Sequence, residues 1–313
     1  MSAHAAARGA LATTVAGIPF QNPVLLAAGT AAYGREINGV IDVESLGGII
    51  TKAVSVEPRA GASAPRVADF PGGMINAIGL ANPGVEAVRG EHLPWLAKLS
   101  RARVLVNVVG RVVEDFSEVV GALDGADGVS GYELNVSCPN TRAGGLEFGA
   151  DPVALTTLIQ RARAATARPL FVKLSPTLPD VAVIAKCAVD AGADGLSLVN
   201  TLPGLVIDLE TRRPALGFGT GGTSGPGLRP VGVLATWKVR KAVRVPIIGI
   251  GGISTAEDVL QYVLAGASLV AVGTAALANP RIPERIVDDL GRWCAAHGVH
   301  ALDALSGTLE WPQ

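Results

Sequence analysis

Short apolar runs alternate with amphipathic segments along most of the chain. The runs are rich in valine, leucine and isoleucine and have no polar face, which is typical of parallel strands covered on both sides. They predict eight strands, at 24–28, 49–52, 104–108, from 132 onward, and at 170–174, 195–200, 246–250 and 268–272. The segments between them have helical periodicity and predict helices at 36–46, 84–99, 114–123, 152–166, 179–191, 229–243, 256–266 and 274–296.

Residue types at the segment ends support this division. Asp151 followed by Pro152 is typical of a helix N-terminus, and Gly192 is typical of a helix end. The sequence from Ser254 to Glu257 predicts a capping box. Strands that alternate with helices over 313 residues predict a (β/α)8 TIM barrel, with a doubly wound open sheet as the competing architecture.

Three regions lack the pattern. Residues 13–23 predict a short hairpin, and residues 57–83 and 201–226 are long loops rich in glycine and proline. The alanine-rich residues 1–12 predict a disordered N-terminal tip. We therefore expect a single barrel domain over residues 13–313.

Composition narrows the functional classes. Hydrophobic residues make up 49% of the chain and charged residues 17%, against the usual charged share of about 25%, which predicts a large core and a buried subunit interface. The net charge is -1 and no basic tract occurs, so nucleic acid is not expected as a partner. No apolar run approaches the roughly 18 residues of a membrane span, and no strong secretory signal precedes the first strand. We expect a cytoplasmic protein.

Polar and reactive side chains stand where the predicted strands end, which is where TIM barrels carry their active sites. The strand that begins at 132 stops at Pro139, and an amide and a thiol stand just before it. In chain order these strand ends hold Gly29, Thr30, Lys52, Asn107, Asn135, Cys138, Lys173, Asn200, Thr201, Gly251, Gly252, Gly273 and Thr274.

Two of these residues are lysines within apolar runs. A buried ammonium is costly unless it has an anionic or electron-rich partner, so Lys52 and Lys173 predict an anionic ligand. The alternative is pairing with a carboxylate of the strands themselves, for which Glu133 is the one candidate inside the runs.

The last two strands end in glycine turns that face helix starts. Exposed backbone N–H groups at Gly251, Gly252, Gly273 and Thr274 suit a phosphate, and barrels often bind one after strands seven and eight. The alternative is ordinary tight turns. Residues 217–222 match the dinucleotide fingerprint, but they lie within a loop rather than between a strand and a helix, so we expect no NAD site on this chain.

The cysteine and histidine positions exclude several chemistries. Cysteines at 138, 187 and 294 form no disulfide, metal or iron–sulfur pattern, so no metal site is expected. Cys138 follows a strand and is a candidate reactive thiol, whereas Cys187 and Cys294 lie in predicted helices and are expected to be structural. No strand end carries a histidine or a pair of carboxylates, which disfavours triad and glycosidase chemistry. The four histidines are at 4, 92, 297 and 300.

Five motifs occur in order along the chain: Asn76-Ala-Ile-Gly-Leu80, Asn135-Val-Ser-Cys-Pro-Asn140, Val172-Lys-Leu-Ser-Pro176, Ser224-Gly-Pro226 and Gly249-Ile-Gly-Gly252. In these motifs the chain resembles the dihydroorotate dehydrogenases, FMN-containing (β/α)8 barrels that oxidise dihydroorotate to orotate in pyrimidine synthesis. Cysteine at 138 resembles class 1 rather than the membrane-associated class 2, and the segment 76–84 resembles class 1B. The chain departs from the family at Ala28, where a serine usually contacts the flavin.

The resemblance implies a role for each strand-end residue. It makes Cys138 the base that removes a proton from C5 of dihydroorotate while a hydride passes from C6 to N5 of FMN. It implies that substrate binds to Lys52, Asn76, Ala77, Ile78, Gly79, Leu80, Asn135, Asn200 and Thr201. It implies that one FMN binds to Ala28, Gly29, Lys52, Ala53, Asn107, Asn135, Lys173, Val199, Gly225, Gly251, Gly252, Gly273 and Thr274.

Within these sets the resemblance distinguishes the two lysines. It assigns Lys52 to the substrate carboxylate and the flavin, and Lys173 to the N1–C2=O edge of the flavin. The glycine turns would hold the ribityl phosphate. Residues 141–149, also rich in glycine, could cover the site.

The chain has no motif for the second half of the reaction, in which the reduced flavin passes its electrons to an acceptor. Resemblance to class 1B implies a homodimer that joins a partner subunit bearing FAD and a [2Fe–2S] cluster, in a heterotetramer that reduces NAD⁺. The alternatives are a fumarate-dependent class 1A homodimer and a dihydropyrimidine dehydrogenase barrel. A phosphate-binding isomerase or lyase barrel would need acidic strand ends, and a non-catalytic barrel would bind no flavin.

Overall fold

A computed structural model describes residues 9–137 and 147–312 of the chain, so Cys138 and most of the segment 141–149 lie outside the described residues. Eight parallel strands close into a barrel in which β10 follows β9 and pairs with β15. This confirms the (β/α)8 barrel and excludes the open sheet. The strands are β3 (Val24–Leu26), β4 (Gly48–Ile50), β7 (Arg103–Val108), β8 (Gly131–Asn135), β9 (Leu170–Leu174), β10 (Gly195–Leu198), β15 (Ile247–Ile250) and β16 (Leu269–Val272).

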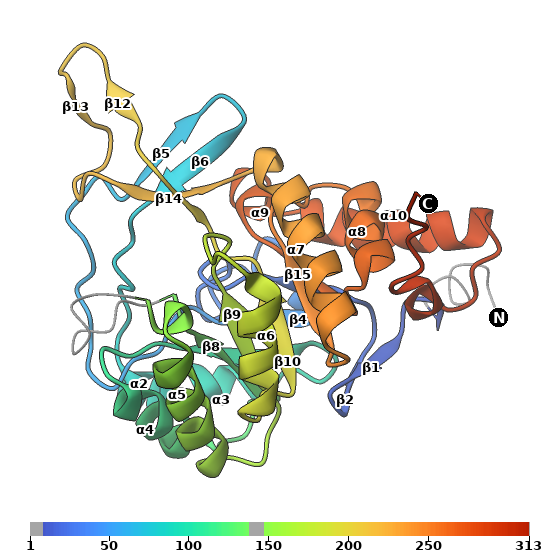
Figure 1. The fold of residues 1–313 in the computed structure, drawn as a ribbon, viewed down its shortest axis with the longest axis horizontal. Helices are drawn as coiled ribbons and strands as arrows, with labels where there is room; N and C mark the ends of the chain where they lie inside the picture. Colours follow the sequence, from blue (N-terminus) through green and yellow to red (C-terminus); the bar gives the residue numbers. More distant parts are fainter. Residues whose placement is uncertain (1–8, 138–146, 313) are drawn as a thin grey trace.

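Helices surround the barrel (Figure 1). The predicted caps hold at two of them, because Asp151 accepts from the backbone N–H groups of Val153 and Ala154, and Gly192 takes a positive φ after a helix. The helices are α2 (Val85–Ala87), a π-helical turn (Val88–His92), α3 (Leu93–Leu96), α4 (Val113–Leu123), α5 (Pro152–Ala164), α6 (Val181–Asp190), α7 (Arg229–Ala242), α8 (Ala256–Ala265), α9 (Thr274–Ala278) and α10 (Ile282–Ala296).

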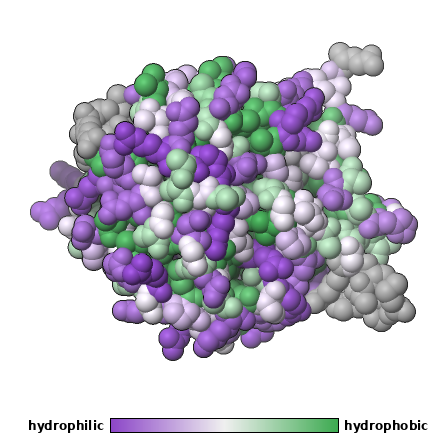
Figure 2. Space-filling model, turned by 90° about the horizontal axis from the view of Figure 1, so that it is seen from below, coloured by the Kyte–Doolittle hydropathy of each residue, from purple (hydrophilic) through white to green (hydrophobic). Residues whose placement is uncertain are grey.

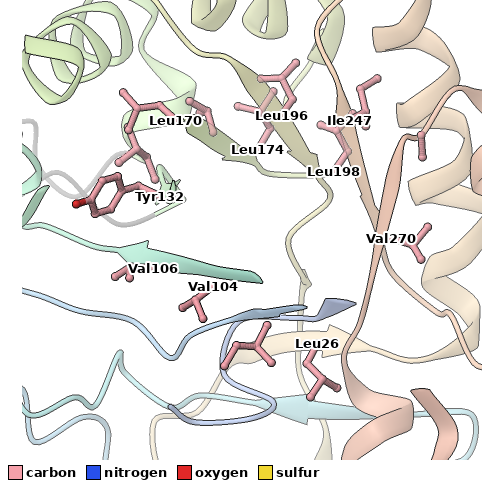
Figure 3. Close-up of a cluster of buried hydrophobic side chains, with 14 of the residues drawn as sticks. Leu26, Val104, Val106, Tyr132, Leu170, Leu174, Leu196, Leu198, Ile247 and Val270 are labelled. Carbon is pink, nitrogen blue, oxygen red and sulfur yellow. The ribbon is translucent and has the colours of Figure 1, made fainter. Parts of the chain in front are cut away.

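Apolar side chains form one layer outside the barrel and another inside it. Figure 3 shows the outer layer, in which Val106, Tyr132 and Leu170 project from the strands among the residues that the helices cover. The inner layer includes Leu105 and Phe171. It also contains Val15, Ile18 and Phe20 of the hairpin β1 (Thr13–Val15) and β2 (Ile18–Phe20). The predicted hairpin is therefore confirmed, and it closes the N-terminal end of the barrel.

The two long loops contain strands that the sequence did not reveal. A four-stranded antiparallel sheet joins them in the order β11–β14–β6–β5, which brings residues 67–76 beside residues 202–224. Glycine, proline and polar residues dominate these segments, so no alternation marks them. The strands are β5 (Val67–Phe70), β6 (Gly73–Asn76), β11 (Leu202–Gly204) and β14 (Gly221–Ser224), and β12 (Ile207–Asp208) pairs with β13 (Arg213–Pro214) in the projecting hairpin of Figure 1.

Three predicted segments differ from the structure. Residues 36–46 form turns and a short 3-10 helix (Val43–Ser45), because Asn38 and Gly39 are poor helix formers and Asp42 caps the new turn. The predicted final helix divides into α9 and α10 near Pro280, which cannot continue a helix. The capping box of α8 begins one residue later than predicted, with Thr255 as N-cap and Asp258 as its partner.

The N-terminal tip was predicted too long. Residues 1–8 lie outside the described part of the chain, but Ala10 and Leu11 are buried in the outer core. The backbone N–H of Leu302 donates to the carbonyl of Ala10, which fixes this segment to the C-terminal region. Within residues 9–137 and 147–312, no helix is long and apolar enough to span a bilayer. On the face shown in Figure 2, polar side chains are interspersed with smaller apolar patches.

Candidate active site

A cavity of about 690 Å³ lies where the C-terminal ends of the barrel strands meet the second sheet. Its size is that of a site for a cofactor and a small substrate. Ala77 and Gly79 do not line it; Gly79 packs against the backbone of Ala62 instead. The other described residues of the predicted site all line the cavity: Ala28, Gly29, Lys52, Ala53, Asn76, Ile78, Leu80, Asn107, Asn135, Lys173, Val199, Asn200, Thr201, Gly225, Gly251, Gly252, Gly273 and Thr274.

Three asparagines from both sheets converge on the cavity. Asn200 donates through Nδ2 to Oδ1 of Asn135 at 3.4 Å, and its own Oδ1 accepts from the backbone N–H of Thr201 at 2.9 Å. Asn76, at the end of β6, donates to the carbonyl of Gly222 at 3.2 Å. Each amide keeps further donor or acceptor capacity. Such a set suits a ring that carries alternating carbonyl and N–H groups.

The two lysines line the cavity without a carboxylate partner. Lys173, on β9, is only 6% exposed, and Lys52 is half-buried two residues beyond β4. Among the described residues, no Asp or Glu oxygen lies within the 4.0 Å ion-pair limit of either ammonium. The alternative of strand carboxylate pairing fails, since Glu133 accepts from Nδ2 of Asn107 at 2.7 Å instead. Two cations in one cavity without a carboxylate partner in the described part of the chain favour an anionic ligand.

Another part of the cavity is built from glycine backbone. Gly225 and Gly252 have φ values of +128° and +66°, which glycine adopts readily. A Cβ at Gly252 would lie 2.7 Å from the backbone nitrogen of Arg229, so no larger residue fits without a shift. The hydroxyl of Thr274 donates to Oγ of Ser224 at 2.6 Å beside this loop. Backbone N–H groups and hydroxyls gathered at barrel strands seven and eight are suited to a phosphate.

Several cavity residues were missed as site residues by sequence reasoning. Ser224 stands directly before Gly225 in the motif Ser224-Gly-Pro226. Its hydroxyl beside a predicted flavin-binding glycine is the feature that could have identified it. Val67, Gly73 and Met74 come from the unpredicted second sheet and carried no signal of their own. The residues concerned include Val67, Gly73, Met74, Ser224, Leu228, Ile253 and Ser254.

Side chains of α8 support the loop that follows β15 and contains Gly251 and Gly252, here called the glycine loop. The hydroxyl of Tyr262 lies 2.7 Å from the carbonyl oxygen of Gly251. Asp258, which is 2% exposed, accepts from the backbone N–H and the hydroxyl of Ser254, both at 2.9 Å, and forms an ion pair with Arg229. Burial alone would raise the pKa of Asp258, but the hydrogen bonds from Ser254 and the positive charge of Arg229 outweigh it and lower the pKa.

Asp258→Asn should therefore loosen the glycine loop and destabilise the fold by about 1–3 kcal/mol at neutral pH, the usual effect of losing a buried charged hydrogen-bond partner. A lowered folded-state pKa contributes stability above the unfolded pKa, and that contribution is lost as pH falls through the folded pKa. The difference between wild type and variant should thus shrink in acid, below the ordinary Asp value of 3.8. Urea denaturation at neutral and acidic pH measures both effects.

Asp190→Asn is the matched control, because Asp190 pairs with Lys186 on the exposed surface of α6. It should leave stability almost unchanged. Equal losses in the two variants at neutral pH would contradict the role given to Asp258.

Comparisons with known proteins agree with this site. Residues 10–293 match the family described as dihydroorotate dehydrogenase. The chain is 46% identical over 300 residues to proteins of Geobacter sp. (strain M21) and Pelobacter propionicus, each named dihydroorotate dehydrogenase B (NAD(+)), catalytic subunit, covering 96% of this chain and 98% of each relative. It is 48% identical over 301 residues to the putative dihydroorotate dehydrogenase A (fumarate) of Solibacter usitatus, covering 96% and 99%.

These matches span almost the whole barrel rather than a single motif. The relatives share the oxidoreductase name, and those named as B-type catalytic subunits agree with the class 1B resemblance of residues 76–84. The chain therefore belongs to the dihydroorotate dehydrogenase family, in class 1 and nearest to class 1B.

Proposed function

We propose that the chain is the FMN-binding catalytic subunit of a class 1B dihydroorotate dehydrogenase, which oxidises (S)-dihydroorotate to orotate in pyrimidine synthesis. The observation that carries this proposal is that one cavity contains three features. They are the glycine backbone of the phosphate-type site, two lysines without carboxylate partners among the described residues, and three convergent asparagines. A phosphate, a flavin ring and a carboxylated pyrimidine require those three parts.

The residues present fit FMN. Gly225, Gly251, Gly252, Gly273 and Thr274 would hold the ribityl phosphate through backbone N–H groups and a hydroxyl. Asn107, Val199 and Lys173 would meet the ring, with the lysine ammonium at the N1–C2=O edge, where negative charge gathers on reduction. Ala28 has no hydroxyl, so it can offer only backbone groups. When bound, FMN supplies the acceptor for a hydride.

The asparagines would recognise the substrate ring. Asn76, Asn135 and Asn200 can each donate and accept, which matches the alternating amide groups of a dihydropyrimidine. Lys52 would neutralise the carboxylate, with the hydroxyl of Thr201 nearby. Ala77 and Gly79 do not line the cavity, so we assign them to the shape of the loop that presents Asn76, Ile78 and Leu80.

Cys138 would supply the base. As thiolate it would remove the proton from C5 while the hydride leaves C6. A thiol with an ordinary pKa of about 8.5 needs only modest activation for this. Cys138 lies three residues beyond the end of β8, whose Asn135 lines the cavity. Its role rests on the family motif and on this place in the chain.

The electrons would leave through a partner subunit that carries FAD and a [2Fe–2S] cluster and reduces NAD⁺. Within residues 9–137 and 147–312 no cluster of His, Cys, Asp and Glu could hold a metal ion. The B-type relatives are named as NAD(+)-linked catalytic subunits. We propose a homodimer that joins this subunit in a heterotetramer. The putative fumarate-dependent relative keeps class 1A as the second candidate.

Two comparisons test this function. Bound flavin should be reduced by dihydroorotate and far more slowly by dihydrouracil, since Lys52 needs a carboxylate; equal rates would favour a dihydropyrimidine dehydrogenase. The reduced protein should then be reoxidised by NAD⁺ only when the partner subunit is added. Rapid reoxidation by fumarate alone would assign the chain to class 1A.

A further inference from the structure

Glu133 is a buried acid that the proposed mechanism does not use. It lies on β8 with no exposed surface, and its Oε1 accepts from Nδ2 of Asn107 at 2.7 Å. Its other oxygen, Oε2, is also buried and has no hydrogen-bond partner among the described residues. A buried carboxyl oxygen without a partner is costly, so this position needs a physical reason.

The strand register places Glu133 beside residues that line the cavity. β8 lies between β7 and β9, and Glu133 pairs with Asn107 on one side and Phe171 on the other. Lys173 pairs with Asn135, two residues further along β8, so Glu133 and Lys173 are diagonal neighbours on the inner face. Asn107 and Lys173 line the cavity, while Leu105 and Phe171 belong to the apolar inner layer.

A hydrogen bond that joins β7 to β8 does not require an acidic residue. A glutamine would accept from Asn107 equally well, and its second group would carry no charge. What distinguishes Glu133 is a negative charge one strand away from the ammonium of Lys173, at a depth that solvent does not screen.

We propose that Glu133 is a positioning residue of the flavin site, which fixes the amide of Asn107 and offsets part of the positive field of Lys173 at the flavin. This inference rests on the proposed function. Because Lys173 favours the anionic reduced flavin, the charge of Glu133 lowers the affinity of the site for electrons and keeps the flavin able to pass them on.

The test is the midpoint potential of bound FMN, measured by anaerobic titration against a reference dye. Glu133→Gln keeps the shape and the acceptor for Asn107 but removes the charge. It should shift the equilibrium about tenfold toward reduced flavin, the size expected for one unscreened charge at short range. For a two-electron couple this is a rise of about 30 mV.

Ser197→Ala is the matched control. Ser197 is also fully buried, its hydroxyl has no partner among the described residues, and it pairs with Lys173 from the other side, on β10. Because the hydroxyl is neutral, its loss should leave the potential unchanged. Glu133→Asp keeps the charge and should also stay near the wild-type potential. Glu133→Leu, a second neutral variant, should share the rise.

An unchanged potential in Glu133→Gln with FMN bound would overturn the inference, as would an equal rise in Ser197→Ala. Either result would leave the proposed function intact. A wild-type protein that binds no FMN would instead overturn the proposed function, so the two failures can be told apart.

Discussion

Cys138→Ala should slow the reduction of bound FMN by dihydroorotate by about 10²–10⁴-fold, the usual contribution of a positioned general base. The proton at C5 would have no acceptor. The variant would still bind FMN, and its asparagines would still bind the pyrimidine ring. FMN content and the affinity for orotate should therefore stay close to wild type. Anaerobic stopped-flow absorbance of the flavin measures the rate, and a spectral titration with orotate measures the affinity.

Cys187→Ala is the matched control for the loss of a thiol. Cys187 lies on α6 as a free, half-buried cysteine and does not line the cavity. Its replacement should leave the rate of flavin reduction unchanged. If Cys138→Ala reduced FMN at nearly the wild-type rate, another group would have to be the base.

Lys173→Met should have opposite effects on catalysis and on stability. Methionine fills a similar volume without charge, so the reduced flavin would lose its electrostatic partner and the reductive half-reaction should slow by about 10²–10³-fold. In the flavin-free protein the buried ammonium has no carboxylate within 4.0 Å among the described residues, and the diagonal neighbour Glu133 offsets only part of its charge. Its removal should therefore raise stability by about 1–3 kcal/mol. Urea denaturation of the apoprotein and stopped-flow reduction of the FMN-loaded form measure the two effects.

Lys186→Met controls for the change of side chain. Lys186 is exposed on α6 and paired with Asp190, so neither the stability of the apoprotein nor the rate should change much. A destabilised Lys173→Met apoprotein would mean that the ammonium has a partner in the empty site and would contradict this account.

The barrel was predictable because its strands are apolar on both faces. A lysine within such a run is conspicuous, so Lys52 and Lys173 could be singled out without coordinates, and both line the cavity. The glycine turns after the last two strands were equally visible. The positive φ values of Gly251 and Gly252 explain why those positions hold glycine.

The second sheet was not predictable from local pattern. Strand β14 is Gly-Gly-Thr-Ser and β11 is Leu-Pro-Gly, so neither has the alternation or the run of β-branched residues that is typical of a strand. Their hydrogen bonds come from segments that are distant in the chain, such as the pairing of Gly222 with Asn76. The wall of the cavity that this sheet forms, with Met74 and Ser224, was therefore missed.

The supporting contacts of the site were also outside the reach of sequence reasoning. The apolar runs offer Glu133 as a carboxylate partner for a lysine, but its Oε1 accepts instead from Asn107 on the neighbouring strand. Asp258 was not singled out from the sequence, and its ion pair with Arg229 joins α8 to α7. Both contacts depend on how neighbouring units pack, which no local spacing encodes.

The central claim is that this chain binds FMN and that dihydroorotate reduces it. The most direct measurement is an anaerobic titration of the purified, FMN-loaded protein with dihydroorotate, followed by visible absorbance and by orotate formed. The account predicts that the flavin bleaches fully and that one orotate appears for each FMN reduced. A protein that takes up no FMN, or whose bound flavin stays oxidised with excess dihydroorotate, would contradict it.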